Sequence, residues 1–270
     1  MNLCIDVGNS QLHGAVYGDS GKLLMQLRKE SSHRVSSDEM GLFLVSALRE
    51  KGFDSGSIGR IGISCVVPEE THTLRVACRD YFNTEPLFLE AGVKTKLKIK
   101  TRNPLEVGAD RIANAIAASE RYPNGNVVVV DFGTAITVDA VSFEREYLGG
   151  AICVGLGLAM EALGTKTAKL PHVEIVRSKK ALGRSSIESI QNGLYFGYLG
   201  LVRELVCQIG GEAFGRDAHK TIATGGYSQL YRDEDLFDEI IPDLVLQGVN
   251  TVLKLNPIEM QPETVVADKS

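Results

Sequence analysis

Residues 126–137 read N-V-V-V-V-D-F-G-T-A-I-T, and this order of residue types predicts a β-hairpin. Four consecutive valines favour a strand that is buried on both faces of a sheet. Gly133 permits a tight turn, and the alternation through Ile136 and Val138 favours a returning strand. The turn would place Asp131 and free backbone N–H groups at the end of a rigid sheet, where they can bind an anion such as phosphate. The alternative is an ordinary Asx-type hairpin turn without a ligand.

A second stretch of the same kind begins the chain. Residues 1–11 read M-N-L-C-I-D-V-G-N-S-Q, an apolar run followed by Asp6, one apolar residue, Gly8 and two polar residues. Asp6 and Asp131 are separated by nearly half of the 270 residues. The repeat favours two similar halves that face a shared cleft, although D-x-G is short enough to recur by coincidence.

The composition is that of an ordinary globular protein, with 44% hydrophobic and 23% charged residues. The net charge of −5 argues against nucleic acid or an anionic membrane as the main partner. No apolar run approaches the roughly 18 residues of a membrane span, and no signal peptide is visible before Asp6. Five scattered cysteines without C-x-x-C spacing fit a reducing compartment rather than a zinc site or disulfides. We therefore expect a cytoplasmic protein.

Elsewhere, strand patterns alternate with helix patterns, as in an α/β protein. Amphipathic spacing and capping residues predict helices at 36–51, 69–82, 158–163, 187–209 and 243–255. Apolar runs predict strands at 58–67, 86–89 and 221–224. The turn Y-P-N-G at 122–125 is the expected boundary between an N-terminal domain, 1–122, and a C-terminal domain, 123–270. The polar tail after Pro257 is expected to fray.

Residues 94–102 read K-T-K-L-K-I-K-T-R, so basic residues occupy every second position. Lysines at a period of two are typical of the solvated face of an edge strand, which resists pairing with other sheets. The functional alternative is a cationic wall that guides an anionic substrate.

Residues 103–111 read N-P-L-E-V-G-A-D-R and lead into an alanine-rich helix pattern. Asp110 falls at the start of this helix, where aspartate is a preferred capping residue and is favoured by the helix dipole. The same position would also fix an ionised carboxylate at the edge of the sheet. Such a carboxylate can accept a hydrogen bond from an attacking hydroxyl, because phosphoryl transfer needs positioning more than a strong base. Arg111 could hold a carboxylate or a phosphate in a bidentate fork.

Glycines recur at two further places. Gly193, Gly197 and Gly200 fall inside the predicted helix at 187–209, where each costs about 1 kcal/mol relative to alanine. We therefore expect a close neighbour there, such as another helix or a second copy of the chain. The strand at 221–224 ends in T-G-G, which suggests a further nucleotide-binding edge. Neither a G-x-G-x-x-G fingerprint in a βαβ setting nor a P-loop sequence occurs, so the pattern excludes a P-loop kinase.

Six short stretches together resemble the type III pantothenate kinases, a family of the actin and sugar-kinase superfold. They are I-D-V-G-N-S at 5–10, V-G-A-D-R at 107–111, D-F-G-T-A-I-T at 131–137, L-G-G-A-I-C-V-G at 148–155, G-R-S-S at 183–186 and T-G-G at 224–226. The resemblance implies two ribonuclease H-like, actin-like domains, each a mixed sheet with flanking helices, and a cleft between them. It also implies ATP-dependent phosphorylation of the hydroxyl of pantothenate, a step of coenzyme A biosynthesis.

The resemblance further implies roles for individual residues. Asp110 would be the catalytic base, Asp6 would hold Mg²⁺ through the ATP phosphates, and Asp131 would bind a monovalent cation, K⁺ or NH₄⁺. The residues implied to bind ATP are Asp6, Val7, Gly8, Asn9, Ser10, Gln11, Leu12, His13 and Thr134. Those implied to bind pantothenate are Gly108, Ala109, Asp110, Arg111 and Ser186. The family also implies a homodimer with the pantothenate site near the subunit interface.

One pair of residues departs from the family pattern. Thr101 and Arg102 stand where the family often has Tyr-Asp, and that tyrosine lines the pantothenate site. The departure affects substrate packing rather than the residues around phosphate. Two other functions fit the same fold, a non-catalytic accessory regulator of transcription and a phosphate-ester hydrolase in which water replaces the alcohol. The three aspartates argue against the regulator, and phosphate release without pantothenate would favour the hydrolase.

Overall fold

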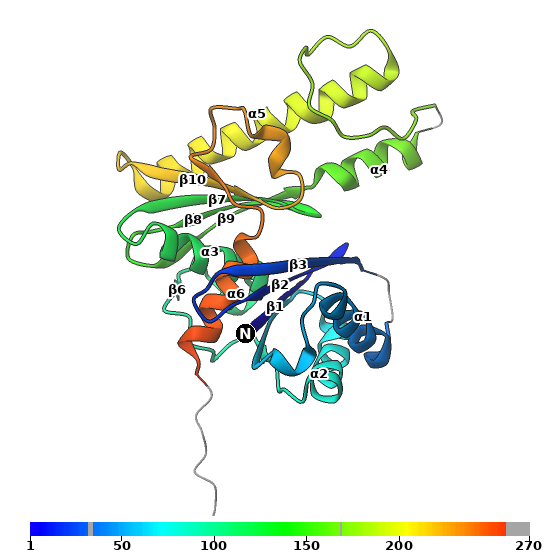
Figure 1. Cartoon of the computed structure of the whole chain (residues 1–270). Helices are drawn as coiled ribbons and strands as arrows, with labels where there is room; N and C mark the ends of the chain where they lie inside the picture. Colours follow the sequence, from blue (N-terminus) through cyan, green and yellow to red (C-terminus); the bar gives the residue numbers. More distant parts are fainter. Residues whose placement is uncertain (32–34, 168, 258–270) are drawn as a thin grey trace, which may run out of the picture.

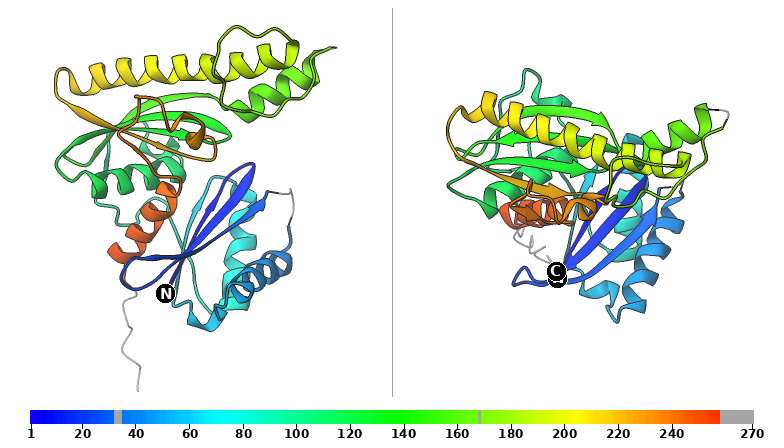
Figure 2. Two further views of the ribbon diagram at one scale, coloured as in Figure 1. Left: turned by 45° about the horizontal axis from the view of Figure 1, so that its top comes forward. Right: turned by 90° about the horizontal axis from the view of Figure 1, so that it is seen from above.

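The structure, a computed structural model, describes residues 1–31, 35–167 and 169–257. Two mixed β-sheets lie one above the other, with helices between them and on both outer faces (Figures 1 and 2). The strand order is β3-β2-β1-β4-β5 in the first sheet and β11-β10-β7-β8-β9-β6 in the second. The predicted fold class, two mixed sheets with flanking helices, is therefore confirmed.

The first sheet is built from the beginning of the chain. Its strands are β1 (Asn2–Val7), β2 (Gln11–Tyr17), β3 (Leu23–Glu30), β4 (Arg60–Cys65) and β5 (Leu87–Phe88). The outer face is covered by α1 (Ser37–Glu50) and α2 (Pro68–Phe82). Ile5 of β1 packs there in one buried core with Leu44 of α1 and Leu74 of α2, which explains the alternation of apolar residues in these elements.

The second sheet repeats the topology of the first. Its strands are β6 (Lys98–Ile99), β7 (Asn126–Phe132), β8 (Ala135–Val141), β9 (Glu146–Val154), β10 (His219–Thr224) and β11 (Glu239–Ile240). β7 pairs antiparallel with β8 and parallel with β10, just as β1 pairs antiparallel with β2 and parallel with β4. Helices α4 (Leu156–Lys166) and α5 (Ser186–Phe214) flank the outer face, and short 3₁₀ turns lie at Ser55–Ser57, Pro104–Glu106 and Ser228–Tyr231.

Two helices, α3 (Ala109–Arg121) and α6 (Leu244–Leu255), lie between the sheets (Figures 1 and 2). Cys4 of the first sheet, Ala113 of α3 and Val249 of α6 share one buried cluster. The two helices approach closely, because a Cβ atom at Gly248 would lie only 2.0 Å from the backbone oxygen of Ala113. The middle layer therefore connects both sheets and holds the start of α3 in place.

Replacing Gly248 by alanine is expected to lower the free energy of unfolding by about 3 kcal/mol, because the added methyl group would push α3 and α6 apart. Urea denaturation measures the loss. Gly211→Ala is the matched control, since Gly211 lies in α5 with no atom within 4 Å of an added Cβ atom. The control is expected to keep or slightly raise stability, and an equal loss in both variants would contradict this account.

One sequence prediction needs correction, and another keeps only one of its two alternatives. The basic stretch at 94–102 is not a long strand: only Lys98–Ile99 pairs, at the edge of the second sheet, and the positive φ of Lys96 (55°) precedes it. The Nζ atoms of Lys98 and Lys100 lie 3.8 and 3.1 Å from Glu146 Oε1, so these lysines contact β9. Within the described chain, nothing outside the helix lies within 4 Å of an added Cβ atom at Gly193, Gly197 or Gly200. The neighbour expected there is therefore not another described helix of this chain, and a second copy of the chain stays a prediction.

The other predicted elements are confirmed, with α5 reaching further, to Phe214. The boundary between 1–122 and 123–270 stays a prediction, and the predicted fraying after Pro257 concerns residues outside those described. In the described ranges, we find no helix with the length and apolar character needed to cross a membrane.

Candidate active site

The tips of the two predicted hairpins meet. Ser10 Oγ, in the turn after β1, lies 2.7 Å from Thr134 Oγ1, in the turn after β7, although 124 positions separate them in the sequence. Each turn is closed by a glycine N–H: Gly8 donates to the backbone oxygen of Gln11 at 3.0 Å, and Gly133 donates to that of Ala135 at 3.1 Å. The D-x-G repeat therefore encodes two turns at corresponding places in the two sheets, and their tips touch.

Three carboxylates lie near these tips. Asp6 and Asp131 are the second-to-last residues of β1 and β7, and Asp110 lies in the first turn of α3. Burial and, to a smaller extent, the charge of Asp110 raise the pKa of both Asp6 and Asp131 to about 7. Burial also raises the pKa of Asp110, against the lowering effect of Arg111. The site thus holds clustered negative charge, which favours a ligand that brings cations.

Asp131 connects three elements. Asn114, one turn after Asp110 in α3, donates from Nδ2 to Asp131 Oδ2 at 2.8 Å. On the other side, Gly225 of the T-G-G stretch has a φ of 87°, and a Cβ atom there would lie 2.4 Å from Asp131 Oδ1. A residue with a side chain could not occupy that position. The loop after β10 therefore borders the same carboxylate as α3.

Several buried oxygen atoms around this cluster lack a hydrogen-bond partner among the described residues. They are Asp6 Oδ1, Ser64 Oγ and Asn114 Oδ1. Unpaired oxygens of this kind suit a hard cation such as Mg²⁺ or K⁺. Within the parts of the chain that the structure covers, no three His, Cys, Asp or Glu residues are grouped closely enough to hold a metal ion by themselves. The residues therefore fit Mg²⁺ that takes most of its ligands from phosphate and water.

The V-G-A-D-R stretch has a definite local geometry. Gly108 is the N-cap residue of α3, and a Cβ atom there would lie 2.4 Å from Asp110 Oδ1. Asp110 Oδ1 accepts a hydrogen bond from the backbone N–H of Arg111 at 2.7 Å. Arg111 in turn forms an ion pair with Asp139 of β8. This stretch thus places one carboxylate and one guanidinium side by side at the start of α3.

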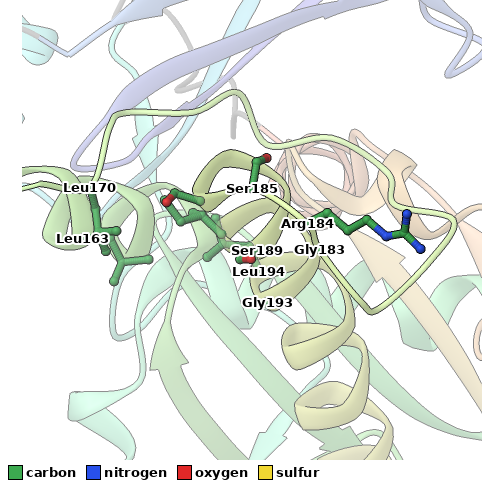
Figure 3. A pocket seen from close by; sticks show the side chains of 10 residues that line it. Leu163, Leu170, Gly183, Arg184, Ser185, Ser189, Gly193 and Leu194 are labelled. Carbon is green, nitrogen blue, oxygen red and sulfur yellow. The ribbon is translucent and has the colours of Figure 1, made fainter.

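Some residues expected to bind ligands do not join this cluster. The side chains of Val7 and Leu12 are buried in the core of the first sheet, so only their backbone atoms could contact ATP. Ser186 lines a pocket between α4 and the first turns of α5 (Figure 3), and none of the three aspartates lines that pocket. His13 lies half-buried opposite Asp6, and burial lowers its pKa to about 4.

Sequence reasoning missed four residues of this region, namely Ser64, Asn114, Asp139 and Tyr147. Two of them carried a usable signal. Asn114 follows Asp110 by four positions, which places both on one face of α3. Asp139 is a charged residue in the otherwise apolar alternation of β8, where burial without a partner would be costly. Ser64 and Tyr147 had no such signal.

The repeated actin-like sheets, the meeting hairpin tips and the aspartates beneath them define a phosphotransferase of the actin and sugar-kinase class. The sequence model of the family described as type III pantothenate kinase matches residues 2–208. The chain belongs to the type III pantothenate kinase family.

Individual relatives agree with this assignment. The chain is 51% identical to the type III pantothenate kinase of Legionella pneumophila strain Corby, over 95% of this chain and 99% of the relative. It is 42% identical to that of Elusimicrobium minutum, with the same coverage. Among solved structures, a protein assigned to the Baf family of transcriptional activators from Campylobacter jejuni aligns with a TM-score of 0.60 and 21% identity, over 93% of this chain and 97% of the other. At that identity the likeness shows the fold alone.

Proposed function

We propose that this chain transfers the γ-phosphate of ATP to the hydroxyl group of pantothenate. The observation that carries the proposal is the contact between Ser10 and Thr134, which brings two glycine-containing turns together at the ends of the strands that carry Asp6 and Asp131. Family membership supports pantothenate as the acceptor. The regulator reading is weaker, because its support is a likeness of fold at 21% identity.

In the proposed mechanism, the ATP phosphates lie against the backbone N–H groups of the two turns. Asp6 would hold Mg²⁺ together with the phosphates, and Asp131 with Asn114 Oδ1 would hold a monovalent cation. Both cations would neutralise charge on the phosphates. Asp110 accepts a hydrogen bond from the pantothenate hydroxyl and takes its proton as the oxygen bonds to the γ-phosphorus. The bond between the γ-phosphorus and the bridging oxygen breaks in line, and ADP leaves.

The remaining substrate contacts follow from charge. Pantothenate carries a carboxylate at the end opposite its reacting hydroxyl. Arg111, adjacent to Asp110 and mostly buried but still accessible, is the cation that we assign to this carboxylate. Gly108 and Ala109 would contact the acceptor through their backbone.

The test is an assay of ADP release by the purified protein with MgATP. Pantothenate is expected to be required, and K⁺ or NH₄⁺ is expected to raise the rate above that in Na⁺. Absence of pantothenate-dependent ADP release would contradict the kinase function. Release of inorganic phosphate at the same rate without pantothenate would instead support the hydrolase.

We also propose that the active form is a homodimer that buries the open face of α5. Gly193, Gly197 and Gly200 share one face of this helix, with nothing in the described chain within 4 Å of an added Cβ atom. Exposed Leu182 and Ile187 lie beside its first turn. Ser186, in the same turn, would then lie near the subunit interface, as the family resemblance implies for pantothenate-binding residues.

The variant Gly197→Glu is expected to be monomeric in light scattering, because the open face tolerates the side chain in one chain but not against a second helix. Leu42→Glu, at an exposed position of α1 on the other sheet, is the control and is expected to remain dimeric. A monomeric wild-type protein, or a dimeric Gly197→Glu variant, would contradict the proposed interface.

A further inference from the structure

Two buried residues next to Arg111, Asp139 and Tyr147, have no part in the mechanism above. Arg111 Nε donates to both carboxylate oxygens of Asp139 at 3.2 Å, and Nη2 donates to Asp139 Oδ1 at 2.5 Å. The hydroxyl of Tyr147 donates to the same oxygen at 2.7 Å. Asp139 is only 2% exposed and Tyr147 is fully buried. Three donors from two elements therefore converge on one carboxylate.

The strand next to β8 leaves room for the Asp139 carboxylate at this place. Gly150 pairs with it across β8 and β9, and a Cβ atom at Gly150 would lie 2.6 Å from Asp139 Oδ1. The ring of Tyr147 also faces the guanidinium, with its centroid 5.7 Å from Arg111 Cζ. The orientation of the Arg111 guanidinium is thus determined by β8 and β9, although Arg111 itself belongs to α3.

This orientation has a chemical consequence. A guanidinium has five N–H donors, and Asp139 occupies the side formed by Nε and one N–H of Nη2. The outer edge, formed by Nη1 and the second N–H of Nη2, remains available for a second carboxylate in a bidentate arrangement. The Arg111 side chain is 14% exposed, so part of it is open to a ligand.

We propose that Asp139 and Tyr147 are positioning residues that hold the outer N–H edge of Arg111 for the carboxylate of pantothenate. They thereby determine the preference for an acceptor that carries an anionic group. The inference rests on the proposed function. A role in stability alone is a poor explanation of the pair, because the desolvation of two buried charges offsets much of their attraction.

The test compares Michaelis constants of Asp139→Asn and Tyr147→Phe. Asp139→Asn is expected to raise the KM for pantothenate by about 30-fold, because the unpaired guanidinium loses its fixed orientation, while the KM for ATP changes by less than about twofold. Tyr147→Phe keeps the ion pair and is expected to raise the KM for pantothenate by about threefold to tenfold. It also keeps the proposal testable if Asp139→Asn does not fold.

Glu239→Gln is the matched control. Glu239 pairs with Arg121 at the other end of α3 through two hydrogen bonds, so this variant also removes the charge of an arginine partner on the same helix. Its Michaelis constants are expected to equal those of the wild type. An uncharged analogue with CH₂OH in place of the pantothenate carboxylate, used as a competitive inhibitor, should bind wild type and Asp139→Asn equally well.

Three results would overturn the inference. The first is an equal increase in the KM for pantothenate and the KM for ATP in Asp139→Asn, and the second is unchanged Michaelis constants in both Asp139→Asn and Tyr147→Phe. The third is that Asp139→Asn binds the uncharged analogue more weakly by the same factor as pantothenate. These outcomes differ from a failure of the proposed function, which would appear as a wild-type protein without pantothenate-dependent ADP release.

Discussion

Asparagine in place of Asp110 is expected to lower kcat by about three orders of magnitude, because an amide cannot take the proton of the attacking hydroxyl. The start of α3 should remain intact, since asparagine accepts the hydrogen bond from the N–H of Arg111 as aspartate does. The KM for ATP should therefore stay close to that of the wild type. Initial rates of ADP release at saturating pantothenate measure the effect.

Glu120→Gln provides the control for this experiment. Glu120 lies near the exposed end of the same helix and pairs with Arg145 at 2.6 Å, away from the three aspartates. Its kcat is expected to match that of the wild type. If Asp110→Asn retained more than about a tenth of the wild-type kcat, Asp110 would not be the catalytic base.

Asparagine in place of Asp131 is expected to stabilise the ligand-free protein at pH 8 while it removes most of the activity. Burial raises the pKa of Asp131 from 3.8 to about 7, so its ionised form is disfavoured in the folded state. The variant avoids that cost and can keep the hydrogen bond from Asn114. The gain is expected to be of the order of 2 kcal/mol, or about 5 °C in Tm.

The pH dependence follows from the direction of the shift. The folded protein binds the proton of Asp131 more tightly than the unfolded chain, so this group stabilises the fold most below its ordinary pKa of 3.8. That stability is lost as the pH rises through about 7. The difference in Tm between Asp131→Asn and the wild type should therefore be small at pH 5 and largest at pH 8.

These melts need a buffer without divalent metal, K⁺ or nucleotide, because bound cations would favour the ionised carboxylate and hide the effect. Asp233→Asn is the control, since Asp233 is exposed and paired with Arg177 at the surface. Its Tm is expected to stay within about 2 °C of the wild type at both pH values. If the Tm of Asp131→Asn minus that of the wild type were lower at pH 8 than at pH 5, ionisation of Asp131 would not destabilise the fold.

Both experiments concern one property of the site. Asp6, Asp110 and Asp131 are buried close together at the cost of stability, and a ligand that carries cations would offset the loss of solvation and the smaller repulsion between them. We expect MgATP to raise Tm more in the wild type than in Asp131→Asn for this reason.

Much of the fold could be predicted because the relevant signals are local. An apolar run followed by D-x-G predicts a strand and a turn in both halves, and a glycine N–H closes each turn, Gly8 on Gln11 and Gly133 on Ala135. The position of Asp110 at the start of α3 also followed from its neighbours, Gly108 and the alanines after it. The prediction of a long edge strand at 94–102 was wrong although basic residues do alternate there. The backbone has a positive φ at Lys96, so only two residues of this stretch pair with a neighbouring strand.

The sequence by itself determined the elements, the two equivalent turns and the aspartates at their bases, since these depend on residues a few positions apart. Only the tertiary structure decided which groups face each other. The hydrogen-bonded pairs are separated in the sequence by 17 positions for Asn114 and Asp131, 28 for Arg111 and Asp139, and 124 for Ser10 and Thr134. These contacts depend on how α3 and α6 pack between two sheets, and that packing results from the summed burial of apolar side chains over the whole chain rather than from any local pattern.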